Sequence, residues 1–195
     1  TAFINSQVAE LTPLIQSGDI GTAIIWIGAN DLAPLCNTEY TRNNYMALRN
    51  TMLFRLESGI TGLMNAGLAA EDIYMVTQAD RGDYQPCSNS EQLSNLVDVL
   101  NQGVYDMADE HGNNVIDVTA VFAELSSYII NVNGDVQIAG HIVYNEACDE
   151  PDCFSVADGH PNTVANGIVL NALFVDALDV DRLSDNEIVD IAGLE

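Results

Sequence analysis

The sequence contains no lysine, and its five basic residues, all arginine, stand against 29 aspartate and glutamate residues. The formal net charge at pH 7 is -24. Because so acidic a surface repels phosphate groups, we expect neither nucleic acid nor an anionic membrane as a partner. High salt screens the self-repulsion of such a surface, so we predict that the protein comes from a saline environment.

An alternative explanation of the acidic residues is that they bind divalent cations, but the sequence shows no ordered loop of ligands. The segment Asp179–Leu183 begins like a calcium loop, yet it lacks the glycine and the third ligand of that motif. We therefore expect no metal site and no cofactor.

Long apolar runs are also missing. No stretch approaches the ~20 apolar residues of a transmembrane helix, so we expect no membrane span. Neither an initiator methionine nor a signal peptide is present, which predicts that the chain starts downstream of its natural beginning. At 195 residues, 48% of them hydrophobic, the chain is long enough for one core and short for two. We predict a single domain over residues 1–195.

Cysteines are few, and none forms the CxxC spacing of a zinc site. The four residues, Cys36, Cys87, Cys148 and Cys153, allow three complete pairings. Cys36 and Cys87 each follow a predicted strand at the same expected sheet edge, and Cys148 and Cys153 can close a small loop. We favour these two disulfides and hence a secreted or cell-surface protein. The alternative is buried free thiols.

Apolar periodicity predicts alternating helices and strands. We expect helices over 3–16, 41–65, 90–110, 119–129, from 161 onward and 184–193, and extended segments over 22–27, 73–77, 115–118 and 136–144. A polar loop should follow Asn30 and run through Asn37, and Gly140 should break the last extended segment. Ser184 and Glu187 have the spacing of a capping box before the last helix. This alternation favours an α/β fold with a mostly parallel sheet. Gly59 and Gly62 lie inside the second helix, which indicates close contact with a neighbouring element.

The most informative stretch is an apolar run over 23–27 that ends at Gly28-Ala29-Asn30-Asp31. An unbroken run of this kind is typical of a strand buried on both faces, and ligands bind just beyond the carboxyl ends of such strands. Gly28 permits a sharp turn, and the Asn30 amide can donate to an oxyanion. The simpler interpretation is an ordinary Asn-Asp turn.

A second polar stretch, Asp158-Gly159-His160-Pro161, places a carboxylate and an imidazole on one short turn. Together the two tetrapeptides resemble the third and last motifs of the SGNH (GDSL) hydrolases, and the tail over 183–188 resembles the ending of bacterial members. The resemblance implies a serine esterase or lipase with a flavodoxin-like, three-layer α/β/α sandwich. Its substrate would be an acyl ester of a lipid or an acetylated carbohydrate.

By this resemblance His160 is the catalytic base, Asp158 its orienting carboxylate, Asn30 an oxyanion donor and Gly28 the residue that shapes the turn. The family usually has Asp three residues before His, whereas Ala157 stands there in this sequence. The Gly-Asp-Ser nucleophile motif is absent, and the first helix looks like the one that follows it in the family. We expect a missing first strand and a serine in an amino-terminal segment of the same or a separate chain.

Without that serine, residues 1–195 would be an esterase fragment that is inactive alone. We consider two other functions beside this one. One is a catalytically degenerate domain used for carbohydrate binding or as an extracellular structural subunit, which the shortened histidine turn favours. The other is a processed amino-terminal nucleophile at Thr1, around which the sequence supplies no site. If the family resemblance holds, Asn30 and His160 should converge at one crevice.

Overall fold

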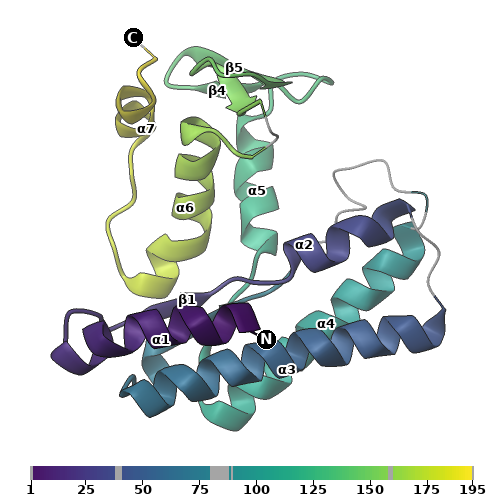
Figure 1. The fold of residues 1–195 in the computed structure, drawn as a ribbon. Coiled ribbons are helices and arrows are strands. Elements are labelled where there is room, and N and C mark those ends of the chain that lie inside the picture. The colour runs from purple at the N-terminus through teal and green to yellow at the C-terminus, as the bar shows by residue number, and fades with distance from the viewer. Residues whose placement is uncertain (1, 38–40, 80–87, 89, 158–159, 195) are drawn as a thin grey trace. The chain divides into compact units, whose positions relative to one another are not determined.

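A computed structural model of the protein describes residues 2–37, 41–79, 88, 90–157 and 160–194. The chain divides into two compact units, residues 1–116 and residues 117–195, called here the N-terminal and C-terminal units (Figure 1). Helices and short strands alternate in both, so the predicted α/β class is confirmed. Within the part of the chain that is described, no helix combines the length and the apolar character that crossing a membrane requires.

The N-terminal unit contains a parallel sheet, as the continuous apolar runs predicted. Its strands are β1 (Ala23–Ile25), β2 (Ile73–Val76) and β3 (Asn114–Ile116), hydrogen-bonded in the order β1-β2-β3. Ile24 lies opposite Tyr74 in the register of the first pair. All three strands point the same way, so their carboxyl ends meet at one edge of the sheet.

The helices of this unit largely follow the predicted ranges. They are α1 (Ala2–Ser17), α2 (Ala29–Leu32), η1 (Ala33–Asn37), α3 (Arg42–Ala66), η2 (Ala70–Asp72) and α4 (Ser90–His111). The expectation of a polar loop after Asn30 is wrong, because α2 and η1 occupy that stretch. Leu32 and Leu35 are buried there, and burying them favours the compact helical conformation over an open loop.

Helix α1 packs closely on α3 at the two glycines inside α3, which confirms the contact inferred from the sequence (Figure 1). A Cβ atom on Gly59 would lie 2.5 Å from Cδ1 of Ile4, and one on Gly62 would lie 2.9 Å from Cγ1 of Val8. Any larger residue would push the helices apart. The position of α1 is therefore fixed by these glycines.

The core of the N-terminal unit lies between the sheet and its helices. Ile60 of α3 and Ile73 and Met75 of β2 are fully buried at its centre. A neighbouring cluster joins Leu32 of α2 to Leu96 of α4. The segment that follows β1 is thus anchored to the main helices by apolar contacts.

In the C-terminal unit, the residues that the structure describes form a small sheet and three helices. Its elements are α5 (Thr119–Tyr128), β4 (Val136–Ile138), β5 (His141–Ala147), β6 (Cys153–Ser155), α6 (Thr163–Leu178) and α7 (Asp185–Ala192). Strands β4 and β5 form an antiparallel hairpin, and β6 pairs parallel with β5. The predicted extended segment that breaks at Gly140 is this hairpin, and α5 packs beside α6 (Figure 1).

The ends of two helices test the sequence signals directly. Pro161 was expected to begin a helix, but α6 begins at Thr163, because the side chain of Asn162 caps it by accepting the Thr163 N–H at 2.7 Å. The capping box before the last helix is confirmed. Ser184 accepts the N–H of Glu187, and the Glu187 carboxylate accepts the Ser184 N–H at 2.8 Å.

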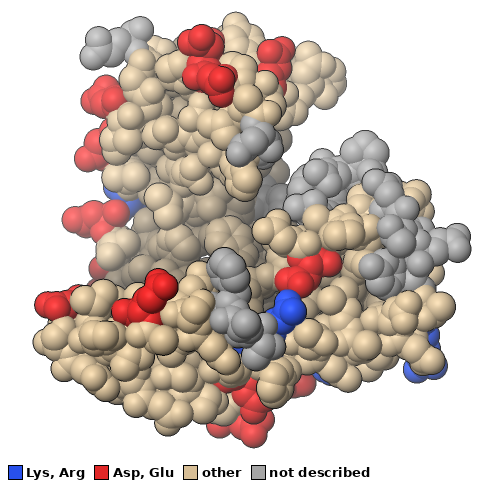
Figure 2. Space-filling model, in the orientation of Figure 1, with Lys and Arg blue, Asp and Glu red and all other residues tan. Residues whose placement is uncertain are grey.

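Acidic side chains are spread over the visible face of the molecule, and basic ones are few (Figure 2). Among the described residues, two arginines form ion pairs, Arg55 with Asp31 at 3.0 Å and Arg182 with Glu124. These pairs leave most of the negative charge of the chain without a nearby cation, since the formal total is -24. Repulsion among the acidic groups therefore opposes folding at low ionic strength.

We expect the melting temperature to rise by several degrees between dilute buffer and 1 M sodium chloride, where the screening length falls to about 3 Å. In a chain of this size a gain of 1 kcal/mol corresponds to about 2–4 °C. Differential scanning fluorimetry in sodium chloride and, as a control for specific ion binding, in potassium chloride measures the effect. A melting temperature that stays flat in both salts would contradict the saline interpretation.

Candidate functional site

The turn after β1 is built around Gly28. This residue has φ +119°, a conformation that L side chains rarely adopt. A Cβ atom here would also overlap Cε of Met52 and lie 3.2 Å from Oε1 of Gln78. Both the backbone conformation and the close neighbours require glycine, so the predicted role of Gly28 in shaping the turn fits this geometry.

The residues after Gly28 form the single turn of α2 at the carboxyl end of the parallel sheet. The N–H groups of Asp31 and Leu32 donate to the Gly28 carbonyl at 2.9 and 3.0 Å. Asn30 is exposed on this turn, whereas the Asp31 carboxylate accepts a hydrogen bond from Nη1 of Arg55 at 3.0 Å. The two polar side chains therefore differ: Asp31 is engaged in an ion pair, and the Asn30 amide faces solvent.

A buried glutamine, which the sequence analysis did not identify, supports the turn from the next strand. Gln78 is only 4% exposed, and its Nε2 donates to the carbonyl of Ile27 at 2.7 Å. Its backbone is held in turn by Asn101 of α4, whose Oδ1 accepts the Gln78 N–H at 2.7 Å and whose Nδ2 donates to the Gln78 carbonyl at 2.9 Å. Gln78 thus fastens the end of β1 to the end of β2 and to α4. The signal in the sequence that could have identified Gln78 is its place as a polar residue directly after a buried apolar run.

In the C-terminal unit, His160 lies in the segment between β6 and α6. The Val156 N–H donates to the His160 carbonyl at 2.8 Å, and Ser155 forms an antiparallel bridge with Pro161. The His160 side chain is exposed. Asp158 lies outside the described residues, so its role in orienting His160 stays a prediction.

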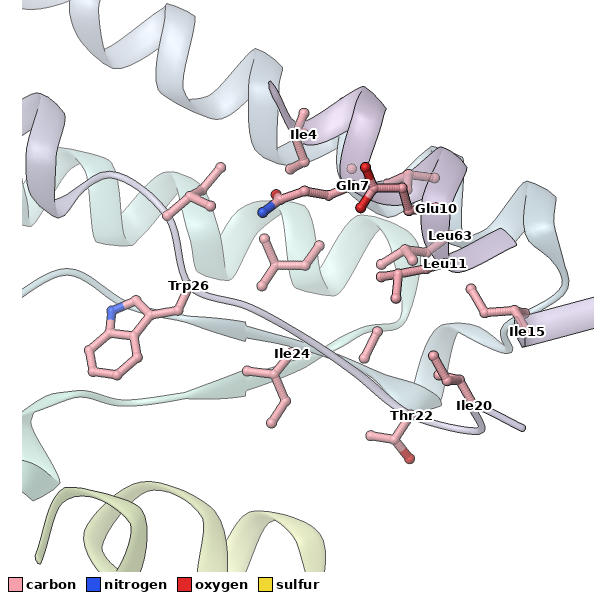
Figure 3. Close-up of a pocket in the computed structure, with 15 residues that line it drawn as sticks. Ile4, Gln7, Glu10, Leu11, Ile15, Ile20, Thr22, Ile24, Trp26 and Leu63 are labelled. Carbon is pink, nitrogen blue, oxygen red and sulfur yellow. The ribbon is translucent and has the colours of Figure 1, made fainter. Parts of the chain in front are cut away.

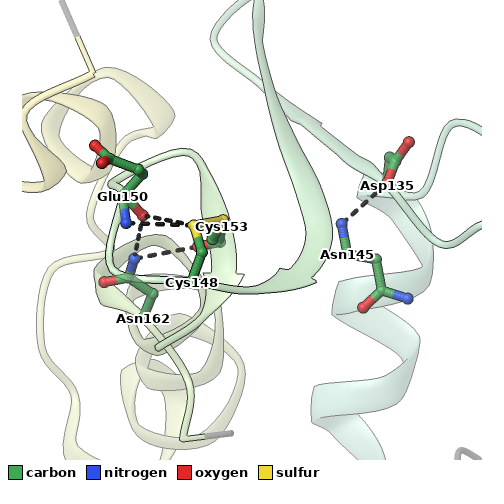
Figure 4. Close-up of a disulfide and its surroundings, with 6 residues drawn as sticks. All are labelled: Asp135, Asn145, Cys148, Glu150, Cys153 and Asn162. Atoms are coloured by element: carbon green, nitrogen blue, oxygen red, sulfur yellow. Dashed lines mark hydrogen bonds between the residues drawn. A yellow bond between two sulfur atoms is a disulfide. The ribbon is translucent and has the colours of Figure 1, made fainter. Parts of the chain in front are cut away.

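The disulfide predicted between Cys148 and Cys153 is present, with a Cα–Cα distance of 5.8 Å (Figure 4). Asn162, the cap of α6, binds this loop through its Nδ2, which donates to the carbonyls of Glu150 at 3.0 Å and Cys153 at 3.2 Å. Its backbone N–H donates to the carbonyl of Phe154 at 2.9 Å. The backbone that follows His160 is therefore anchored to a covalently closed loop.

The second predicted disulfide, between Cys36 and Cys87, stays a prediction, because Cys87 lies outside the described residues. Cys36 itself is buried at 4% exposure near the end of η1. The Cys148 and Cys153 sulfur atoms lie near the Asp152 carboxylate, the one group of potential metal ligands found among the described residues. Because both sulfurs are bonded to each other, they are not thiolates and offer no metal site.

Another carboxylate near this region, Asp135, holds the loop before β4. It accepts the backbone N–H of Asn145 at 2.9 Å (Figure 4) and the side-chain amide of Asn131 at 2.8 Å. These two donors, the Asn131 amide first, hold the pKa of Asp135 below its ordinary value. A general acid must carry a proton near the working pH, so Asp135 is a structural carboxylate rather than a candidate acid.

The structure brings Gly28, Asn30 and Gln78 together within the N-terminal unit and places His160 beside the disulfide loop within the C-terminal unit. Because Asn30 and His160 belong to different units, their convergence at one crevice remains a prediction. No family model matches the sequence, and no curated protein or solved structure is significantly similar to it. The function therefore has to be inferred from these residues themselves.

Proposed function

We propose that residues 1–195 form most of a serine ester hydrolase of the SGNH (GDSL) type, whose nucleophilic serine lies outside them. The observation that carries this proposal is the turn after β1. Gly28 has no room for a side chain, and the exposed Asn30 amide follows it at the carboxyl end of a parallel strand. A side-chain amide at this place in the sheet suits the negative oxygen that forms during acyl transfer. The three-layer α/β/α sandwich of the family is part of the proposal.

The chemistry assigns one role to each site residue. The serine hydroxyl attacks the ester carbonyl while His160 accepts its proton, and Asp158 keeps the imidazole in the tautomer that can do so. The Asn30 amide donates to the tetrahedral oxyanion. His160 then protonates the departing alcohol, and water releases the acyl group in a second cycle of the same steps. The substrate is an acyl ester of a lipid or an acetylated carbohydrate.

Two structural features support this assignment. Gln78 and the Arg55–Asp31 pair hold the backbone and the neighbours of Asn30, so the amide belongs to a rigid turn. The Asn162 contacts with the disulfide loop hold the backbone that follows His160. The disulfide also fits an enzyme that works outside the cell, since such bonds persist in oxidising compartments.

A catalytically degenerate domain that binds carbohydrate or serves as an extracellular structural subunit is the second candidate. The observation that favours it is in the sequence: Ala157 stands where the family has its aspartate, and Asp158 is only two residues before His160. A shorter turn alters the approach of carboxylate to imidazole. In that case the exposed Asn30 and His160 would be surface residues without chemistry.

Labelling with a fluorophosphonate probe, which reacts with activated serines, separates the two candidates. Residues 1–195 alone should neither label nor hydrolyse p-nitrophenyl acetate above background. The natural polypeptide that also carries the proposed serine should do both, and mass spectrometry should find the label outside residues 1–195. Heat-denatured protein is the control for non-specific reaction. A folded natural polypeptide that stays unlabelled would favour the binding domain, and a label within residues 1–195 would refute the assigned nucleophile.

A further inference from the structure

An apolar groove of about 520 Å³ runs along β1 beneath α1 (Figure 3). The described residues that line it are mostly aliphatic and include a single carboxylate, Glu10, but neither cysteine nor histidine. The groove therefore offers a metal ion no set of ligands. Side chains with the chemistry of metal ligands gather instead in the C-terminal unit, at the loop that the Cys148–Cys153 disulfide closes.

Three side chains of this loop hold their potential ligand atoms close together. The Sγ atoms of Cys148 and Cys153 and a carboxylate oxygen of Asp152 all lie within 4.8 Å of one another. Two sulfurs that are each bound at about 2.3 Å to one tetrahedral zinc ion lie about 3.8 Å apart. The two Cα atoms are 5.8 Å apart, so rotation of the cysteine side chains is enough to reach this separation once the sulfurs are no longer bonded to each other.

The spacing of the two cysteines along the chain also fits a metal site. Their sequence separation is 5, which leaves four residues between them. Paired cysteine ligands of structural zinc sites typically have about two to four residues between them. Our expectation of no metal site considered only the shorter CxxC pattern, whereas the longer spacing in this loop lies within the same range.

Backbone hydrogen bonds hold the loop in a form that suits thiolates. The Glu150 N–H donates to Sγ of Cys148 at 3.3 Å (Figure 4), and the Cys153 N–H donates to the carbonyl of Glu150 at 3.2 Å. A donor that points at a sulfur stabilises its negative charge, and the thiolate is the form that binds metal. The Tyr144 N–H donates to the Asp152 carbonyl at 2.7 Å, so the loop is also tied to β5. Its shape does not depend on the disulfide alone.

We propose that, when this disulfide is reduced, Cys148, Asp152 and Cys153 bind Zn²⁺ or a similar soft divalent cation. The loop is then closed by a covalent bond in one redox state and by a metal ion in the other. A dithiol supplies the two electrons: the S–S bond breaks, two thiols form, and the dithiol becomes a disulfide. The ion displaces the two thiol protons into the solvent and takes the Asp152 carboxylate as its third ligand. Because Cys148 and Asp152 are only half-buried, water reaches the fourth position of the tetrahedron.

Charge favours a cation at the reduced loop. Two thiolates and the Asp152 carboxylate would lie together, and Asp149 and Glu150 stand on the same loop. Negative charges this close repel one another, so a cation bound between them lowers the energy of the reduced loop. Thiolate ligands select a soft ion such as Zn²⁺ over Mg²⁺ and Ca²⁺, which prefer oxygen ligands.

Titration with cobalt(II) provides the test, because its coordination by thiolates gives a charge-transfer absorption that oxygen ligands do not give. Residues 1–195 are first reduced with a phosphine, which turns the disulfide into two thiols and takes up the oxygen of a water molecule. We expect a charge-transfer band that saturates at one ion per chain and that zinc(II) abolishes by displacing the cobalt. The oxidised protein should show no band, and magnesium(II) should not displace the cobalt.

Substitutions in the loop localise the ion. Asp152→Asn removes the third ligand and should weaken cobalt(II) binding to the reduced protein about tenfold or more. Asp149→Asn is the matched control, because it makes the same change of charge on the same loop at an exposed residue outside the ligand group. Its affinity for cobalt(II) should stay within about twofold of the unaltered protein, since an exposed charge acts only weakly through water.

The double variant Cys148→Ser/Cys153→Ser should lose the band, which would also show that the other two cysteines do not produce it. Far-ultraviolet circular dichroism checks that each reduced variant is folded. Four results would overturn the inference. They are no band in the reduced protein, an equal band in the oxidised protein, a band that persists in the folded double variant, and equal weakening by the two aspartate substitutions, which would indicate only a general attraction of cations to an acidic loop.

The proposed metal site uses none of the residues assigned to ester hydrolysis. It therefore stands or fails separately from the esterase proposal, and residues 1–195 without the serine are enough to test it.

Discussion

Replacing His160 with alanine should lower ester turnover by the serine-bearing polypeptide by about three orders of magnitude or more. The imidazole accepts the serine proton in the proposed reaction, and no other group replaces a missing general base. Because the His160 side chain is exposed, its removal should leave the melting temperature nearly unchanged. Steady-state kinetics with p-nitrophenyl acetate and a thermal melt measure the two quantities.

The matched control for this change is His141→Ala. His141 is half-buried on β5, in the same unit as His160, and has no assigned role in the reaction. Turnover should stay within about twofold of the unaltered enzyme, since the substitution removes no group that contacts the reacting atoms. A His160→Ala enzyme that retains full turnover would show that the shortened turn has no catalytic role. Equal losses in both variants would point to a structural effect instead.

Replacing Gly28 with alanine should lower the free energy of unfolding by about 3 kcal/mol. A non-glycine residue held in a sparsely populated backbone conformation costs about 1–3 kcal/mol, and forcing extra volume into a well-packed site costs about the same. Both costs apply here, because φ is +119° and a Cβ atom would overlap Met52 and approach Gln78. Urea denaturation followed by circular dichroism measures the loss.

Gly18→Ala separates the two contributions to that loss. Gly18 also has a positive φ, +80°, but a Cβ atom there would meet no heavy atom within 4 Å. It should therefore show the backbone cost of about 1 kcal/mol without the cost of overlap. The excess loss in Gly28→Ala then combines the contact with Met52 and Gln78 and the more strained backbone at φ +119°. Equal losses at the two positions would mean that the turn after β1 is not tightly packed.

What the sequence by itself determined is local. The periodicity of apolar residues predicted α1, α3 and α4 to within about two residues, because a helix that buries one face must repeat its apolar positions every 3.6 residues. The capping box at Ser184 and the disulfide between Cys148 and Cys153 were also predictable, since each joins residues only a few positions apart. The glycine pair in α3 also indicated a close neighbour, because a residue without a side chain leaves room for one.

Features decided by contacts between distant segments appeared only in the tertiary structure. The stretch after Asn30 is helical because Leu32 and Leu35 find apolar partners, and α6 begins at Thr163 because Asn162 caps it while holding the disulfide loop. Gln78 was not identified, because its role depends on the carbonyl of Ile27, far away in the sequence. The groove along β1 likewise exists only because α3 holds α1 beside a strand edge. Local patterns in the sequence show that a residue is to be buried or contacted, but they do not identify the distant segment that will lie against it. Prediction from the sequence therefore fails where contacts between distant segments decide the structure.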